Sequence, residues 1–267
     1  MFLAACIQLN GSSNIERNLS RAEQLIRKAA SHGAELIVTP EATTFLGPHS
    51  RKLELAEEVD GPTNQIFSKL AKELGVHLLI GSVVEKGDEE KVYNTSVLFG
   101  PDGTLIAKYQ KIHLFDVSVP GGVTFKESDT CIPGSDVVVA ETSLGKIGMT
   151  ICYDLRFPEL YAKLIEAGAE IITVPSAFTM ATGKDHWSVL LRARAIETQS
   201  WVIAPGQCGE HDDNGLRHSY GHSIISNPWG TVVAECGDDE GIALAEIDLD
   251  KMRKIRSKMP VGSHRRV

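Results

Sequence analysis

The chain lacks a surplus of basic residues. Its 267 residues include 27 Lys and Arg against 35 Asp and Glu, a formal net charge of −8. Proteins that bind nucleic acid without regard to sequence need a basic face to neutralise phosphates, so this balance argues against that class. Long apolar runs are also missing, since no segment stays apolar over the roughly 20 residues that cross a bilayer. We therefore expect neither a nucleic-acid nor a membrane partner.

A signal peptide and a disulfide framework are missing as well. The segment from Met1 to Gln8 has no basic region and soon gives way to polar residues, so we interpret it as a buried strand. The cysteines are odd in number and far apart, with no C-x-x-C pair, which fits a reducing, cytoplasmic compartment. They are Cys6, Cys131, Cys152, Cys208 and Cys236.

Cofactor and metal motifs are also absent from the sequence. It contains no phosphate-binding P-loop, no dinucleotide fingerprint and no G-x-S-x-G elbow. Histidines and acids gather in residues 211–218, with His222 nearby, but their spacing matches no compact set of metal ligands. We therefore expect no metal.

Two internal similarities divide the chain into halves. Residues 33–41 are similar to residues 168–176, and each copy follows an amphipathic helical stretch that stops at a glycine. Each copy then continues as a short apolar run typical of a buried strand. Residues 93–104 are similar to residues 220–231, and the Pro-x-Gly at the centre of each predicts a hairpin turn.

Each half is therefore predicted to run strand, helix, strand, helix, strand, hairpin. The second helix is expected over residues 63–74 in the first half, ending at Gly75, and over residues 186–198 in the second, with Asp185 as N-cap. This alternation indicates an α/β architecture with helices on one face of each sheet. Two such sheets packed face to face would share one core, so we expect a single domain over residues 1–267.

Cys152 is the candidate reactive thiol. Functional side chains in open α/β sheets gather beyond the carboxyl ends of strands, and Cys152 directly follows the apolar run 146–151. A helix with Pro158 near its start is expected next. Amides at such a helix N-terminus stabilise a thiolate, so we expect a lowered pKa for Cys152. The other four cysteines are interpreted as inert buried residues.

Two charged residues follow apolar segments in the first half. Glu41 ends the run that starts at Ala34, and both a salt bridge and a general base fit a carboxylate there. The corresponding residue of the second half is Ser176, so the repeat itself does not require an acid. Lys111 follows the first hairpin, and taken alone it is interpreted as a solvated lysine. His113 is interpreted as a packed, hydrogen-bonded histidine.

Three segments together resemble the signature blocks of the nitrilase superfamily, the carbon–nitrogen hydrolases. They are Pro40 with Glu41, residues 109–115 and residues 151–160, in the family's order, and the resemblance covers essentially the whole chain. It implies a four-layer α-β-β-α sandwich and subunits that pair through an α face into homodimers or larger homo-oligomers. It also implies no metal or organic cofactor.

The resemblance also implies roles for individual residues. Cys152 takes the position of the nucleophile, Glu41 that of the general base and Lys111 that of the oxyanion stabiliser. Glu127 lies where the family often has a second, positioning carboxylate. In this chemistry the thiol attacks an amide carbon, the base passes the proton to the leaving amine, and water hydrolyses the thioester. Lys111 and the backbone N–H of Tyr153 would face the oxyanion.

The segment after Cys152 narrows the choice of substrate class. It resembles the branch of deaminated glutathione amidases most closely, and the omega-amidases, which act on amides such as 2-oxoglutaramate, less closely. Both branches handle an alpha-keto acid head, so our hypothesis is that Arg156 binds its carboxylate. The resemblance implies that Tyr153, Phe178 and Thr182 complete that pocket. A salt bridge from Arg156 to Glu159 or Asp154 is the structural alternative.

The sequence therefore predicts an amidase for a small alpha-keto acid amide, with deaminated glutathione as first choice. An omega-amidase or another small-amide hydrolase is the alternative. A non-enzymatic alternative is a catalytically silent scaffold that binds other proteins. The presence of Glu41, Lys111 and Cys152 argues against this alternative. A redox-sensing thiol protein would require oxidation of Cys152 without amide turnover.

Overall fold

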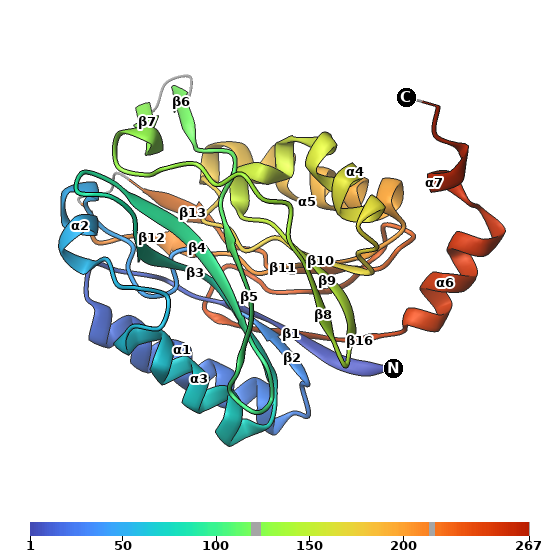
Figure 1. Cartoon of the computed structure of the whole chain (residues 1–267), viewed down its shortest axis with the longest axis horizontal. Coiled ribbons are helices and arrows are strands. Elements are labelled where there is room, and N and C mark those ends of the chain that lie inside the picture. Colours follow the sequence, from blue (N-terminus) through green and yellow to red (C-terminus); the bar gives the residue numbers. More distant parts are fainter. Residues whose placement is uncertain (119–123, 214–216, 267) are drawn as a thin grey trace.

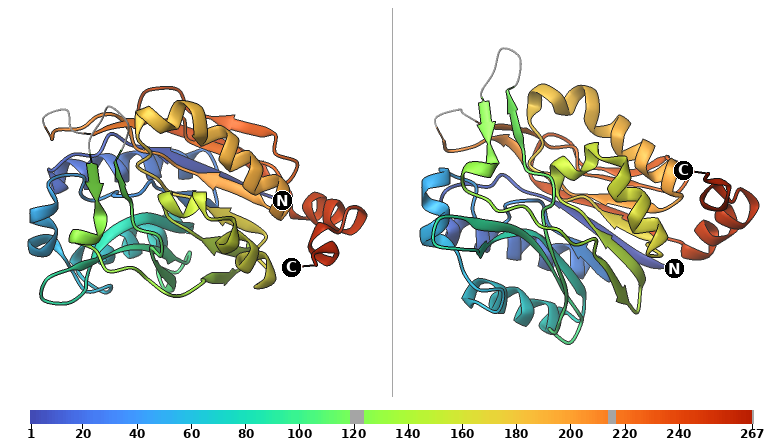
Figure 2. Two further views of the ribbon diagram at one scale, coloured as in Figure 1. Left: turned by 90° about the horizontal axis from the view of Figure 1, so that it is seen from above. Right: turned by 45° about the horizontal axis from the view of Figure 1, so that its top comes forward.

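Two six-stranded sheets lie face to face, and helices cover their outer faces (Figure 1). The structure is a computed structural model that describes residues 1–118, 124–213 and 217–266. From one side to the other, the layers are helices, sheet, sheet and helices, as the turned views of Figure 2 also show. The predicted α-β-β-α sandwich is therefore confirmed.

The first sheet contains the strands of the N-terminal half in the order β16-β1-β2-β3-β4-β5. Strands β1, β2 and β3 are parallel, and β3, β4 and β5 follow one another antiparallel. The predicted first hairpin is confirmed as the β4–β5 pair. The bounds are β1 (Phe2–Gln8), β2 (Leu36–Val38), β3 (His77–Lys86), β4 (Val92–Phe99), β5 (Leu105–Gln110) and β16 (Gly241–Ile247).

The second sheet repeats this arrangement in the order β15-β14-β11-β10-β9-β8. Strands β9, β10 and β11 are parallel, and the predicted second hairpin is the antiparallel pair β14–β15. The bounds are β8 (Val139–Thr142), β9 (Gly145–Met149), β10 (Ile171–Thr173), β11 (Trp201–Ala204), β14 (Ile224–Ser226) and β15 (Val232–Glu235).

The helices bear out the predicted alternation, with one correction. Helices α1 (Ile15–Ser31) and α3 (Pro62–Leu74) cover the first sheet, and α3 ends at Gly75 in the left-handed conformation, as predicted. Helices α4 (Pro158–Glu166) and α5 (Met180–Thr198) cover the second sheet. None of the helices in the described ranges is long and apolar enough to span a membrane.

The predicted start of α5 is wrong. The helix begins at Met180, with Thr179 as N-cap residue, so Asp185 lies inside it. Gly183 hid this first turn, because glycine is a poor helix former and normally signals a loop. Here a Cβ at Gly183 would come within 2.3 Å of the Cβ of Tyr220. The glycine is therefore required by close packing against the neighbouring chain segment.

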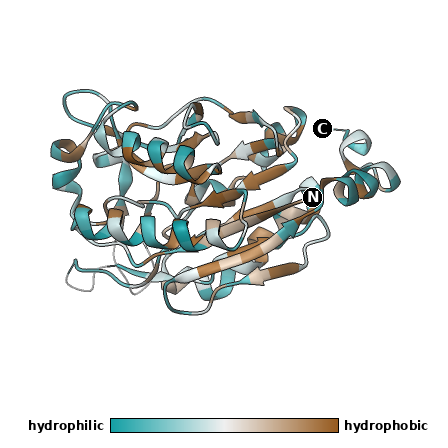
Figure 3. Ribbon diagram, turned by 90° about the horizontal axis from the view of Figure 1, so that it is seen from below, coloured by the Kyte–Doolittle hydropathy of each residue, from teal (hydrophilic) through white to brown (hydrophobic). Residues whose placement is uncertain are grey.

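Strict alternation along the strands builds two hydrophobic layers. Residues such as Ala5, Ile7 and Ile37 point to α1 and α3, whereas Cys6 and Val38 point to the second sheet. Figure 3 shows strands that are largely hydrophobic beneath helices that are hydrophilic on their outer side. Burial of one such aliphatic side chain stabilises the fold by about 1.5–3 kcal/mol, so the layers hold the strand ends in fixed positions.

The C-terminal segment links the two halves. Strand β16 comes from the end of the chain but pairs antiparallel with β1 in the first sheet. Helices α6 (Leu249–Lys258) and α7 (Val261–His264) then extend beyond the sandwich (Figures 1 and 2). Nothing in the local sequence predicted that this strand would join the N-terminal sheet.

Candidate active site

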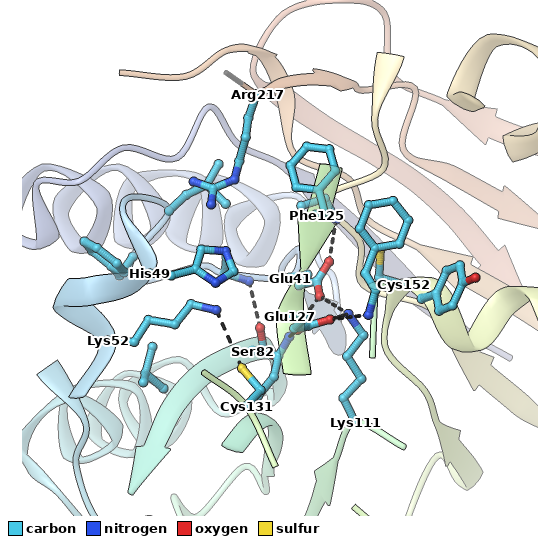
Figure 4. A pocket seen from close by; sticks show the side chains of 18 of the residues that line it. Glu41, His49, Lys52, Ser82, Lys111, Phe125, Glu127, Cys131, Cys152 and Arg217 are labelled. Atoms are coloured by element: carbon cyan, nitrogen blue, oxygen red, sulfur yellow. Dashed lines mark hydrogen bonds and ion pairs between the residues drawn. The ribbon is translucent and has the colours of Figure 1, made fainter. Parts of the chain in front are cut away.

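The predicted site residues come together in one pocket at the end of the sandwich. Glu41 follows β2 and Cys152 follows β9, so each lies beyond the carboxyl end of a parallel strand, as expected. Lys111 follows β5, and Glu127 begins the short helix η2 (Glu127–Asp129). Figure 4 shows these four side chains converging from different elements.

Lys111 is the centre of a buried ion cluster. Its Nζ donates to Glu41 Oε1 at 2.9 Å and to Glu127 Oε2 at 2.8 Å, and its side chain is only 2% exposed. The Nδ2 of Asn94 donates to Oε1 of both Glu41 and Glu127. Interpreting Lys111 as a solvated lysine was therefore wrong, because two carboxylates from other parts of the chain compensate its charge.

Lys111 and Glu127 keep their charges at neutral pH. Burial alone would lower the pKa of Lys111, but the charges of Glu127 and Glu41 raise it well above its usual value. Burial opposes ionisation of Glu127, yet Lys111 and Lys52 outweigh it and bring the pKa of Glu127 down to about 2. Lys111 is therefore a fixed cation between the side chains of Glu41 and Glu127, beside Cys152.

Cys152 is held in a strained turn. It has a φ of +49°, which is unusual for a residue with a side chain, and it begins the 3-10 helix η3 (Cys152–Arg156). Its backbone N–H donates to the carbonyl of Pro175 at 2.9 Å. This turn brings Cys152 into the same pocket as the carboxylate of Glu41.

The expectation of a lowered thiol pKa was wrong. Burial, and next the charge of Glu41, raise the pKa of Cys152 well above its usual value, and Lys111 compensates only in part. Helix α4 does not begin until Pro158, so its N-terminal amides do not follow the thiol directly. The resting cysteine is thus a neutral thiol. Moving its proton to Glu41 leaves the net charge of the cluster unchanged, which makes Glu41 a suitable acceptor.

A titration tests this electrostatic coupling. Because Glu41 raises the pKa of Cys152, Glu41→Gln is expected to lower it, so more thiolate forms at a given alkaline pH even as turnover falls. Ultraviolet thiolate absorbance, with Cys152→Ala subtracted as background, measures the change. A thiol pKa that is unaltered or higher in Glu41→Gln contradicts this account.

Asp154 ties the cysteine turn to the lysine segment. It is fully buried and accepts hydrogen bonds from the hydroxyl of Tyr109 at 2.7 Å and from the N–H of Ile151 at 2.8 Å. The backbone N–H of His113 donates to it at 3.0 Å, and His113 Nδ1 lies 2.7 Å away. Sequence reasoning used Asp154 as part of the signature segment and as a possible partner of Arg156, but did not predict this bridging role. The interpretation of His113 as packed and hydrogen-bonded is confirmed.

Sequence reasoning also missed groups that orient Glu41. The backbone N–H of Ala177 donates to Glu41 Oε2 at 2.8 Å, and Gln207 Nε2 donates to the Glu41 carbonyl at 2.9 Å. The one sequence signal that could have predicted such polar contacts was Asn94, an amide within a predicted strand. Its counterpart in the repeat is Gly221. A polar side chain at a half-buried strand position needs partners, and here these are the two carboxylates.

The predicted substrate-binding residues line the same pocket. The Arg156 guanidinium lies over the ring of Phe178 at 5.1 Å and over that of Tyr153 at 5.9 Å. Within the described ranges it forms no salt bridge with Glu159 or Asp154, so the structural alternative is not observed. Thr182 lines the pocket beside them. The guanidinium thus lies at the pocket wall, where its Nη1 is 3.3 Å from Nδ1 of His186.

The segment that raised the question of a metal is part of the loop structure near the pocket. Nδ1 of His211 lies 2.8 Å from the carbonyl oxygen of Gly11, and its Nε2 lies 2.8 Å from the Ser219 hydroxyl. Both ring nitrogens thus have protein partners. Residues 214–216 of that segment lie outside the described part of the chain.

Comparison with known proteins identifies the family. The family model described as carbon-nitrogen hydrolase matches residues 3–257. The chain belongs to the carbon–nitrogen hydrolases of the nitrilase superfamily. This carbon–nitrogen hydrolase is thus an amidase, an enzyme that acts on carbon–nitrogen bonds other than peptide bonds with a catalytic cysteine. The predictions of family and enzyme class are confirmed.

Its curated relatives lie in two branches. It is 44% identical to the deaminated glutathione amidase of Synechocystis, over 99% of this chain and 98% of that protein. It is 42% identical to the human omega-amidase NIT2, over 99% of this chain and 95% of that protein. The two identities are nearly equal, so they support the amidase class more strongly than either substrate.

A solved structure supports the fold. The crystal structure of the C. elegans NitFhit protein superposes with a TM-score of 0.93 at 37% identity. The match covers 99% of this chain and 65% of that one, so the chain spans about two thirds of the length of NitFhit.

Proposed function

We propose that this enzyme hydrolyses the amide bond of a small alpha-keto acid amide, with deaminated glutathione as the preferred substrate. The observation that carries the proposal is the Glu41–Lys111–Glu127 cluster beside the Cys152 thiol, in a pocket that also contains Arg156. A nucleophile, a proton acceptor and a fixed cation are the groups that amide hydrolysis through a thioester needs.

The first half of the reaction forms the thioester. Cys152 Sγ attacks the amide carbon while its proton passes to Glu41. Lys111 Nζ and the Tyr153 backbone N–H stabilise the negative charge on the former carbonyl oxygen. When the carbon–nitrogen bond breaks, the proton on Glu41 passes to the departing nitrogen, which leaves as an amine or ammonia. Glu127 is a positioning residue that holds Lys111.

The second half releases the acid. Water enters where the amine has left, and Glu41 takes one of its protons as the oxygen attacks the thioester carbon. The carbon–sulfur bond then breaks, and the thiolate of Cys152 recovers the proton from Glu41. The products are an alpha-keto acid and an amine, and the enzyme returns to its starting state. The raised pKa of Cys152 favours this last proton return.

The keto acid end of the substrate is assigned to Arg156, supported by Tyr153, Phe178 and Thr182. A guanidinium fork binds a carboxylate with two hydrogen bonds, whereas lysine offers a point charge. Arg156→Lys is therefore expected to raise KM by about tenfold with a smaller change in kcat, a loss of about 1.4 kcal/mol in binding. Unchanged steady-state kinetics in the variant would remove Arg156 from this role.

The choice of branch rests on the segment from Tyr153 to Leu160. The test measures 2-oxoglutarate release from deaminated glutathione and from 2-oxoglutaramate, with Cys152→Ala as background. Preference for deaminated glutathione supports the proposal. Preference for 2-oxoglutaramate makes the enzyme an omega-amidase with the same mechanism, the alternative that the relation to human NIT2 favours. Release from neither substrate overturns the proposal.

A further inference from the structure

The pocket contains two further cations besides Lys111 and Arg156. Lys52 and Arg217, here called the distal pair, both line it, with His49 between them. Figure 4 shows the distal pair on the opposite side of Glu41 from Cys152. Lys52 begins helix α2 (Lys52–Leu55) and Arg217 precedes strand β13 (His218–Tyr220), so separate parts of the chain bring them together.

Lys52 is the member of the distal pair that forms no salt bridge within the described ranges. Its nearest hydrogen-bond partner is the Cys131 thiol, with Nζ and Sγ 3.7 Å apart, and no carboxylate within the described ranges lies within salt-bridge distance. Glu127 acts on it only at longer range. Burial, and next the charge of Lys52, lower the pKa of His49 to about 4, so this histidine is neutral at pH 7.

The side chain of Arg217 is mostly buried and already held in place. Its Nη1 contacts Asp213 Oδ2 at 3.1 Å and the Gly47 carbonyl at 2.9 Å. Asp213 compensates the charge of Arg217. Both contacts are made by Nη1, so the other nitrogens of the guanidinium are not used by them. A cation that is fixed by the protein loses little freedom when it binds a ligand, so it suits an anionic group of the substrate.

The proposed chemistry orients the substrate relative to the distal pair. Glu41 must pass a proton to the departing nitrogen, so the amine half of the amide lies on the Glu41 side of the scissile bond. Arg156 holds the keto acid half next to Cys152. Whatever is attached to the nitrogen therefore extends past Glu41, toward Lys52 and Arg217.

We propose that the distal pair binds a carboxylate on the amine half of the substrate. The inference rests on the proposed function and deepens it. It assigns to the enzyme amides of amino acids or short peptides, whose leaving group is anionic, in preference to primary amides, which release ammonia. Deaminated glutathione belongs to the first class, because its amine half ends in a carboxylate.

A pair of substrates that differ only in this charge tests the inference. They are deaminated glutathione and its analogue with a C-terminal carboxamide, and the quantity is the ratio of their kcat/KM values. One charge-assisted contact predicts a ratio of roughly tenfold or more in the wild type. Lys52→Met is expected to bring the ratio close to one, while Lys52→Arg keeps most of it. The ratio cancels any general loss of activity, including one transmitted through Glu127.

The controls separate this inference from the proposed function. Lys146→Met removes a lysine that pairs with Glu141 away from the pocket, and the ratio is expected to stay as in the wild type. Arg217→Gln should also reduce the ratio, and it provides the test if Lys52→Met does not fold. Turnover of both substrates with a ratio near one in the wild type, or a ratio that persists in both pocket variants, overturns the inference alone. An absence of turnover on any alpha-keto acid amide overturns the proposed function as well.

Discussion

Cys152→Ala is expected to lower kcat by roughly 10⁶-fold, the scale seen when a covalent nucleophile is removed. Alanine cannot form the thioester, and water attacking the amide directly would lose both the sulfur nucleophile and the charge-neutral proton transfer to Glu41. The substitution removes only one sulfur atom from a buried side chain, so the fold and the part of the pocket around Arg156 should remain. Substrate affinity, measured by calorimetry, should therefore change much less than kcat.

Mass spectrometry of rapidly quenched enzyme provides the second measurement. Wild-type protein should carry a transient acyl group on the peptide that contains Cys152, and the variant should carry none. Cys208→Ala is the matched control, since this thiol is equally buried but lies outside the pocket, and it should keep normal turnover. An acyl group on a different residue, or substantial turnover by Cys152→Ala, would rule out the proposed nucleophile.

Lys111→Met is expected to destabilise the fold by about 3–5 kcal/mol, the usual cost of removing one partner from a buried ion pair. Methionine fills similar volume, but it leaves Glu41 and Glu127 facing each other, joined only by Asn94. Both carboxylates are less than 10% exposed, so water can compensate their charges only in part. The same change removes the proposed oxyanion contact, which lowers kcat by about 10²–10³.

Denaturant unfolding and steady-state kinetics measure the two effects separately. In the double variant Lys111→Met with Glu127→Gln, one of the two uncompensated charges is gone, so much of the stability should return while kcat stays low. A single variant Lys111→Met with wild-type stability would show that the cluster is not electrostatically coupled. Recovery of kcat in the double variant would contradict the role of Lys111 at the oxyanion.

The local repeats predicted the architecture because each part of it depends on short-range rules. Glycine stops such as Gly75, buried strand patterns and Pro-x-Gly hairpins are all written within a few residues. The same rules placed Glu41 and Cys152 beyond strand ends, where sheets of this class expose their functional groups. Local rules failed at Gly183, because its reason is a contact with a distant residue, Tyr220.

The burial of Lys111 could not be predicted from its neighbours in the sequence. Its partners, Glu41 and Glu127, stand 70 and 16 residues away, and only the packing of β2, β5 and η2 brings them to one point. The thiol pKa depended on the same convergence, since the burial of Cys152 and the charge of Glu41 overrode the local expectation. The distal pair of Lys52 and Arg217 was likewise invisible. The predicted cytoplasmic location, single-domain organisation and homo-oligomeric state stay predictions.

The sequence by itself determined the two-half α/β sandwich, the residue types available for chemistry and, through the resemblance of three segments, the nitrilase superfamily. The tertiary structure alone decided the burial of those residues and their convergence in one pocket, which Arg156 and Lys52 also line. The physical reason is that strand and turn formation follow local sterics and hydrophobic alternation. Electrostatic energies instead depend on burial and on charges far away in the chain, which only the folded packing of both sheets sets.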